Sequence, residues 1–261
     1  MESLTLIGSS FFYLFSCCST WLTFRAGGFR PGRFDVAAIT LGVLCQSAFL
    51  MLRGQTEHAC PIGTLSEILI FLSWAMGLFY LAIGPTYRIS LMGAFTAPFI
   101  LALQTIALLL PHSAGPVKNT VNPWIETHAA LSLIAFGAFG MGCVAGIMFL
   151  LQEKQLKSQH PSPIFHYLPP MRLLEKVTAR LLFAGFLLLT MSFAAGLAAG
   201  PLNIGLKFWI ALLLWSAYFI TLLAHQAHHL TANRLATCAI FIFLFALLIL
   251  PSLRYFAHFS S

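Results

Sequence analysis

The sequence predicts an all-α integral membrane protein, a bundle of about eight transmembrane helices with both termini on the external side. Hydrophobic residues make up 59% of the 261 residues and charged residues only 8%, whereas a soluble domain has roughly 25% charged residues. The apolar runs are continuous and about 20 residues long, the length at which a helix spans a bilayer. A transmembrane β-barrel would instead show short alternating segments.

Eight apolar runs are long enough to cross a bilayer as helices. The chain starts with MESLTLIGSSFFYLF, which has no basic segment before its apolar run and therefore predicts a first span instead of a cleaved signal. Neither a linker nor a clear internal repeat divides the chain, so residues 1–261 are expected to form a single polytopic membrane domain. The predicted spans are Leu4–Phe24, Asp35–Leu52, Leu65–Ile83, Ser90–Leu110, His128–Leu151, Val177–Ala199, Leu206–His225 and Leu235–Leu250.

The basic residues are divided unequally between the two sets of loops. The loops after the first, third, fifth and seventh spans hold ten of the 14 Lys and Arg residues, and the opposite side holds Arg53, Lys118, Lys207 and Arg254. Because positive loops stay in the cytoplasm, both termini are expected outside, in the periplasm if the cell is Gram-negative. The predicted location is the inner (plasma) membrane, in contact with membrane lipid. The net charge of +7 is explained by these loops and does not indicate a nucleic-acid partner.

The chain has nine histidines, an unusual number for a membrane protein with so few charged residues. The two membrane faces are about 30 Å apart, so His128 and His225, at opposite ends of their spans, are not expected to share one metal ion. The predicted topology places four histidines at the outer face, namely His58, His112, His128 and His258, and five at the inner face, namely His160, His166, His225, His228 and His229.

His128 stands at the start of the fifth predicted span, and haem fits its surroundings. Haem iron takes axial histidine ligands. Trp124 and Phe136 would supply aromatic walls, and the external basic residues would face the propionates. The alternative is an interfacial histidine that is hydrogen-bonded to a loop.

A zinc or copper site would be expected to recruit Cys or carboxylate ligands. The candidate cluster of that kind is His225, His228 and His229, which share a helix face if the seventh span continues; the alternative is a solvated helix end.

Three further features have a structural and a functional interpretation. Ala138, Gly142 and Gly146 recur four apart in the fifth span, which allows a second backbone or a flat ligand to come close; tight helix packing alone also explains them. Glu67 stands in the first turn of the third span, where Thr64 or Ser66 would cap the helix; coupling to an external site is the alternative. The six cysteines form no C-x-x-C pair and are interpreted as packing residues, with the exception of Cys60, which follows His58 in a loop.

Several segments resemble the CcsA type of cytochrome c assembly protein. HACPIGTLSEILIFLSWAMGLFYLAIG is similar to the family stretch in which a Gly-His-x-Pro turn leads to a "LYES" helix start and a Trp. The run His128-Ala-Ala-Leu-Ser-Leu resembles the family's first external haem histidine, and Trp215-Ser-Ala-Tyr218 followed by His225 resembles the helix that ends in a membrane-embedded histidine. His258 stands where the family places a second external histidine. The resemblance covers residues from about 53 to 261.

The resemblance implies a protein that holds haem b and positions it for cytochrome c assembly. It implies His128 and His258 as axial ligands of the haem iron, His225 as a ligand near the cytoplasmic face and His58 as a further external cofactor-binding residue. It implies a CcsB-like membrane partner and an apocytochrome c. No nucleophile–base pair, phosphate loop or redox Cys pair is recognisable, so an enzyme working alone is not expected; the chain would at most be part of a cytochrome c haem-lyase complex.

The chain departs from the family in lacking the Trp-rich WWD segment. The segment AAGPLNIGLKFW joins the sixth and seventh spans, and Trp209 is the only Trp in it. This fits the shorter HemX-like branch, some members of which are linked to control of haem synthesis, and it leaves open an accessory or regulatory subunit that does not bind haem. A third hypothesis is a metal-ion permease that uses Glu67 and the inner histidines, but scattered ionisable groups do not make a continuous polar path across eight apolar spans.

Overall fold

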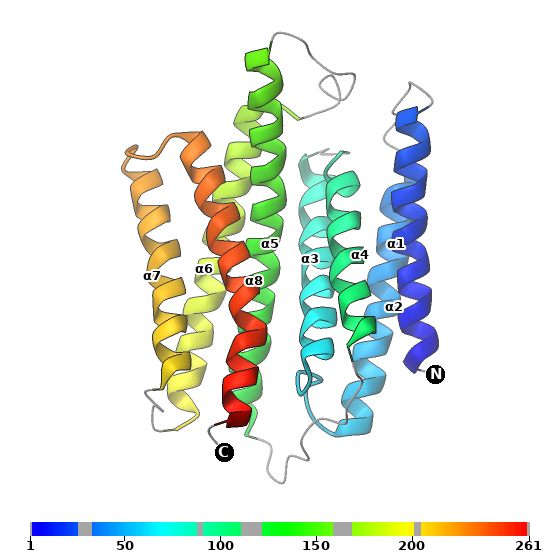
Figure 1. Cartoon of the computed structure of the whole chain (residues 1–261), viewed down its shortest axis with the longest axis vertical. Coiled ribbons are helices and arrows are strands. Elements are labelled where there is room, and N and C mark those ends of the chain that lie inside the picture. Colours follow the sequence, from blue (N-terminus) through cyan, green and yellow to red (C-terminus); the bar gives the residue numbers. More distant parts are fainter. Residues whose placement is uncertain are drawn as a thin grey trace. The chain divides into compact units, whose positions relative to one another are not determined.

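In the computed structural model, the described residues form helices and the turns and short links between them; these residues are 2–25, 33–87, 91–110, 122–158, 169–200 and 205–259. From residue 250 onward only the backbone of the last helix is described. The described residues form eight helices (Figure 1), namely α1 (Glu2–Arg25), α2 (Arg33–Glu57), α3 (Leu65–Tyr87), α4 (Met92–Leu109), α5 (Pro123–Ser158), α6 (Met171–Ala198), α7 (Leu206–Gln226) and α8 (Ala232–Phe259).

All eight helices are long and apolar enough to cross a membrane, which confirms the predicted number of spans within the described residues. Several helices extend beyond the predicted spans: α2 continues to Glu57, α5 to Ser158, and α6 already starts at Met171. α5 starts at Pro123, five residues before the predicted span, and α8 continues to Phe259 through the tail after Pro251 that was expected to be a loop. Hydropathy marks the part of a helix that lies in lipid, whereas capping residues set the helix ends, so the two boundaries differ.

The helices form two compact units. The first comprises Met1–Val117 and Leu151–Met171, and the second comprises Lys118–Leu150 and Arg172–Ser261. The prediction of a single domain stays a prediction, and each unit is described by itself. The residues that the sequence links to haem are divided between them: His58 belongs to the first unit, and His128, His225 and His258 belong to the second.

A buried hydrogen-bond network joins the helices of the first unit, α1 to α4. The hydroxyl of Tyr13 on α1 donates to Oε1 of Gln46 on α2 at 2.8 Å, and Nε2 of Gln46 donates to Oγ of Ser73 on α3 at 2.8 Å and to Oε1 of Gln104 on α4 at 3.2 Å. Both glutamines are fully buried. Because water is absent from a bilayer interior, polar groups there must find partners in the protein. This network therefore fixes how the four helices pack.

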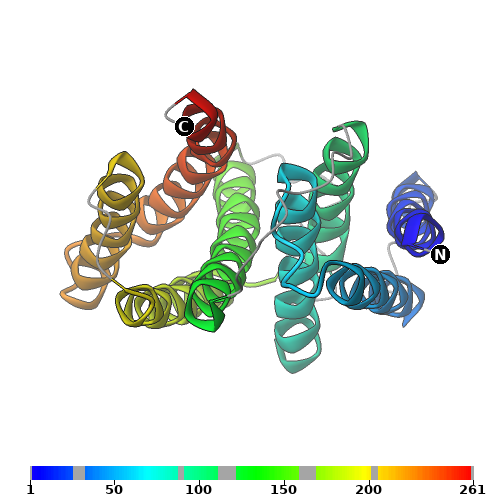
Figure 2. The same cartoon turned by 90° about the horizontal axis from the view of Figure 1, so that it is seen from below.

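The second unit brings α6 between α5 and α7, as the view along the helices shows (Figure 2). A Cβ at Gly185 of α6 would lie 2.6 Å from the ring of Phe139 on α5, and that ring stacks on Tyr218 of α7 with centroids 3.6 Å apart. Gly142 of α5 faces Leu182 of α6, and a Cβ at Gly146 would lie 3.1 Å from the carbonyl oxygen of Ala236 on α8. The small residues of α5 thus serve close helix packing, one of their two predicted roles.

Candidate functional site

The start of α5 is fixed by Asn122, and this determines the position of His128. Oδ1 of Asn122 accepts a hydrogen bond from the backbone N–H of Trp124 at 3.0 Å, the bond that an N-cap residue makes to the second residue of its helix. Pro123 occupies the first helical position, where its missing N–H costs nothing. Nδ2 of Asn122 donates to the carbonyl of Ala199 at 3.1 Å, which ties the start of α5 to the end of α6.

His128 is half-buried and hydrogen-bonded to α6. Its Nδ1 lies 2.7 Å from the backbone oxygen of Ser192 and 3.0 Å from Oγ of the same residue. The Ser192 hydroxyl also lies 2.9 Å from the backbone oxygen of His128 and 2.6 Å from Oγ of Ser132 on α5. A Cβ at Gly196 would lie 3.0 Å from Nδ1, so the glycine leaves room for the ring. Three residues of α6 and α5 therefore hold this imidazole in place.

The bond to the Ser192 carbonyl assigns the tautomer of His128. A carbonyl oxygen accepts but does not donate, so Nδ1 carries the hydrogen in the neutral ring and the lone pair is on Nε2. Histidines that ligate metals almost always donate their other ring N–H to a carbonyl or carboxylate, which orients the ring and makes it more basic. The bond from His128 to the Ser192 carbonyl is of this kind.

A cavity of about 110 Å³ adjoins His128 between α5, α6, α7 and α8. Its wall is apolar on most sides, with Phe136 from α5 and Phe193 from α6, and Lys207 contributes a positive charge from the start of α7. Ala246 and Ile249 close it from α8. The cavity combines an imidazole, two aromatic rings and a cation, which is the environment predicted for the external histidine.

The residues that the sequence predicted beside His128 do not all lie there. Phe136 and Lys207 line the cavity as expected, but Trp124 is half-exposed at the start of α5 and is not among the lining residues. His258 is on α8, the helix that closes the cavity, in the part where only the backbone is described. The predicted partners Lys118 and His112, and the inner histidines His160 and His166, lie outside the described residues, as does the side chain of Arg254.

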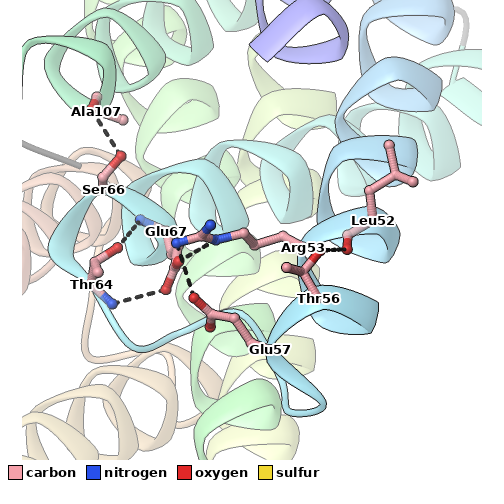
Figure 3. A network of polar contacts seen from close by, with 8 residues as sticks. All are labelled: Leu52, Arg53, Thr56, Glu57, Thr64, Ser66, Glu67 and Ala107. Atoms are coloured by element: carbon pink, nitrogen blue, oxygen red, sulfur yellow. Dashed lines mark hydrogen bonds and ion pairs between the residues drawn. The ribbon is translucent and has the colours of Figure 1, made fainter. Parts of the chain in front are cut away.

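Glu67 lies in the first turn of α3, in the first unit, next to the link from α2 (Figure 3). Oε2 of Glu67 accepts from the backbone N–H of Thr64 at 2.9 Å, and the backbone N–H of Glu67 donates to Oγ1 of Thr64 at 3.2 Å. This reciprocal pair is a capping box, and it confirms Thr64 as the cap. Arg53 bonds Oε1 of Glu67 at 3.0 Å and Oε1 of Glu57 at 2.9 Å. The carboxylate of Glu67 therefore caps α3 and forms an ion pair with Arg53.

His58 itself directly follows α2 and has a φ of 49°. A positive φ is uncommon for a non-glycine residue and is typical of positions that end a helix. Its side chain is exposed. The structure gives His58 a role in turning the chain toward α3, and its predicted role in cofactor binding stays a prediction.

His225 lies at the other end of the second unit, in the last turn of α7. Its Nδ1 is buried and has no hydrogen-bond partner among the described residues. This distinguishes it from His128, whose Nδ1 is bonded to a carbonyl. His225 lines two adjoining cavities of about 460 and 270 Å³ between α6 and α7, and its predicted role as a haem ligand stays a prediction.

The inner group of three histidines does not share one helix face. α7 ends at Gln226, and His228 has a φ of 57°. The N–H of His228 bonds the carbonyl of His225 at 3.1 Å, and that of His229 bonds the carbonyl of Ala224 at 3.0 Å, which is the Schellman pattern that closes a helix. The described residues contain no group of three His, Cys, Asp or Glu side chains placed to hold a metal ion.

Sequence reasoning missed the residues of α6 that hold His128. Ser192 and Gly196 carry no recognisable motif, and they become neighbours of His128 only once α5 and α6 are packed. A signal existed for the helix start: Asn122-Pro123 is an N-cap residue followed by Pro, which predicts a helix that begins ahead of the apolar run.

Comparison with known proteins assigns the family. A family model described as cytochrome C assembly protein matches residues 62–259. The chain belongs to the cytochrome c assembly protein family. Similar proteins are HemX of Brevibacillus brevis, 28% identical over 165 residues, and the cytochrome c biogenesis protein CcsA of Chlorella vulgaris, 27% identical over 142 residues. An uncharacterized 28.8 kDa protein of Azospirillum brasilense is 34% identical over 103 residues.

These matches confirm the predicted resemblance to CcsA and HemX proteins. The matched segments cover 62%, 51% and 39% of this chain for HemX, CcsA and the Azospirillum protein, and 61%, 44% and 38% of those proteins. The chain therefore spans less than two thirds of the length of each. The family assignment and the eight apolar helices together indicate a multi-pass membrane protein.

Proposed function

We propose that this protein takes part in the biogenesis of c-type cytochromes by holding haem b, with His128 and His258 as the axial ligands. The observation that carries the proposal is the hydrogen bond from Nδ1 of His128 to the Ser192 carbonyl at 2.7 Å. It places the lone pair on Nε2 and fixes the ring, which are the two properties a histidine needs to bind haem iron.

The donor set beside His128 fits haem, and the cavity is small for it. Phe136 and Phe193 offer apolar surface to a porphyrin, and Lys207 offers a cation to a propionate. The volume of about 110 Å³ is below the 300–1,000 Å³ or so of typical cofactor pockets. Binding therefore requires the helices around the cavity to separate. α8, which closes the cavity with Ala246 and Ile249 and carries His258, is the element whose displacement would supply both the space and the second ligand.

The residues of the chain would bind and orient, and the chemistry would come from the haem and from partners. When bound, haem supplies the iron and the vinyl groups to which a cytochrome is joined. His128 would hold the iron, Ser192 would keep the imidazole oriented, and Lys207 would pair with an acid group. The proposed partners are an apocytochrome c and a CcsB-like membrane protein, and the proposed location is the plasma membrane with the His128 site at its external face.

The test is the absorption spectrum of the full chain purified in detergent from haem-replete cells. The unsubstituted protein is expected to show a Soret band with sharp reduced α and β bands, and His128→Ala is expected to lose most of it. Added imidazole is expected to restore the band in part, because it can enter the space that the side chain leaves. His229→Ala is the control, since His229 is an exposed histidine of the same unit and is expected to leave the spectrum unchanged.

A HemX-like accessory or regulatory subunit is the second candidate. It is favoured by the HemX match, which covers 62% of this chain against 51% for the Chlorella CcsA, and by the lack of a WWD segment. Protein from haem-replete cells that carries no haem and cannot be reconstituted would overturn the haem proposal. It would favour this candidate, for which His128 and His258 are replaceable and a partner protein co-purifies.

A further inference from the structure

A groove on the surface of the second unit, between α6 and α7, has one charged end and one apolar end. The two cavities beside His225 share Ala179, Arg180 and His225, so they form one continuous depression. Arg172 and Lys176 line its charged end. The aromatic rings of Phe183 and Phe219 line its apolar end, and 49% and 37% of these residues are exposed. The groove is thus amphipathic along its length.

The charged end is lined by more basic than acidic residues. Arg172, Lys176 and Arg180 fall four residues apart on one face of α6 and are exposed, and like charges at this spacing repel. Arg172 also stands in the first turn of the helix, where the helix dipole is positive. Glu175 is the acidic residue that lines the same cavity. An anion in this end of the groove would relieve the repulsion.

His225 presents a hydrogen-bond donor to the groove. Its Nδ1 is buried without a partner among the residues described. Placing the proton there would bury an N–H with no acceptor, which is costly. The favoured tautomer therefore carries the hydrogen on Nε2. A ring in this state donates to an acid oxygen, and it lacks the bond to a carbonyl or carboxylate that fixes the ring of His128.

We propose that this groove binds an anionic phospholipid. The headgroup phosphate lies at Arg172 and Lys176 and accepts from His225, and an acyl chain lies along Phe183 and Phe219. The order of the groove matches that of a lipid in a leaflet, since the cations precede the apolar part of α6 and the aromatic residues are one to two turns further into it. The proposal is independent of the haem site at His128.

The test is lipid retention by the full chain in detergent, measured by native mass spectrometry during titration with dioleoyl phosphatidylglycerol. Saturable binding is expected, with at least tenfold weaker binding of dioleoyl phosphatidylcholine. The double variant Arg172→Gln/Lys176→Gln is expected to weaken phosphatidylglycerol binding about 25-fold, because each of the two basic groups near an anionic headgroup contributes about a fivefold factor. Arg172→Lys/Lys176→Arg, which keeps both charges, is expected to bind within about twofold of the unsubstituted chain, and it shows that the site tolerates substitution.

Arg234→Gln is the matched control. Arg234 is an exposed arginine near the start of α8 and does not line the groove, so its removal lowers the net charge by one, against two in the double variant, without changing the site. An equal loss of phosphatidylglycerol binding in Arg234→Gln would overturn the proposal in favour of a general charge effect. Haem binding that is lost in the double variant and kept in His128→Ala would overturn it in favour of haem in this groove.

Discussion

At the scale of single residues, the hydrogen bond at one ring nitrogen decides what a histidine offers. In His128 the Nδ1–H donates to a carbonyl, which leaves the lone pair of Nε2 as a candidate ligand. In His225 Nδ1 has no partner among the described residues, and the ring becomes a donor. His58 and His228 have a positive φ, and each turns the chain at the end of a helix. Residue type and membrane side alone do not separate these roles.

The ion pair of Glu67 gives a prediction at this scale. Glu67→Gln keeps the shape of the side chain and removes the charge that Arg53 bonds. Only 4% of the Glu67 side chain is exposed, against 24% for Arg53 and Glu57. A buried group left with an unmatched partner costs about 1–3 kcal/mol, so a loss of about 1–2 kcal/mol in the free energy of unfolding is expected, measured by thermal or chemical unfolding in detergent.

The control for Glu67 is Glu57→Gln, which removes the second carboxylate of the same arginine. Because this pair is more exposed and spaced i,i+4 on one helix, the expected loss is at most about 0.5 kcal/mol. Equal losses in the two variants would show that burial of Glu67 contributes nothing.

At the scale of helices, the sequence predicted the interior of each element better than its ends. Continuous hydropathy was enough to find all eight helices within the described residues. The ends depend on caps, and several of them differ from the predicted spans, among them the start of α5 at Pro123 and the end of α8 at Phe259. The packing partners of α5 were also beyond the sequence, because Ser192 and Gly196 reach His128 only through the close α5–α6 contact at Gly185. A single sequence states which residues are small, but it does not state which neighbour fills the space.

The end of α7 gives a prediction at this scale. His228 occupies the position at which a Schellman motif usually has glycine, with a φ of 57°. Left-handed backbone costs a non-glycine residue about 1 kcal/mol. His228→Gly is therefore expected to stabilise the protein and to raise its thermal midpoint by about 2–4 °C.

The neighbouring substitution His229→Gly tests this explanation of His228. His229 is not among the described residues with positive φ, so glycine there adds only freedom to the unfolded chain and is expected to lower the midpoint. A fall in the midpoint for His228→Gly as well would mean that the histidine side chain contributes more than its backbone strain costs.

At the scale of the whole molecule, the distribution of basic residues predicts an orientation that determines what the His128 site can reach. Ten of 14 Lys and Arg residues are on one side in the predicted topology. Both termini and the start of α5 are then external, and the groove at Arg172 is cytoplasmic. The prediction is that alkaline phosphatase fused after Ser261 is active and that green fluorescent protein at the same point is dark.

Reporters inserted between α5 and α6, within residues 159–168, are the control and are expected to behave in the opposite way. If the fluorescent protein glows at the C-terminus and fails between α5 and α6, the topology is inverted. His128 would then face the cytoplasm, and a haem held there could not be offered to an apocytochrome on the external side. That result would leave the family assignment intact and move the proposed function from delivery of haem toward its capture or its sensing inside the cell.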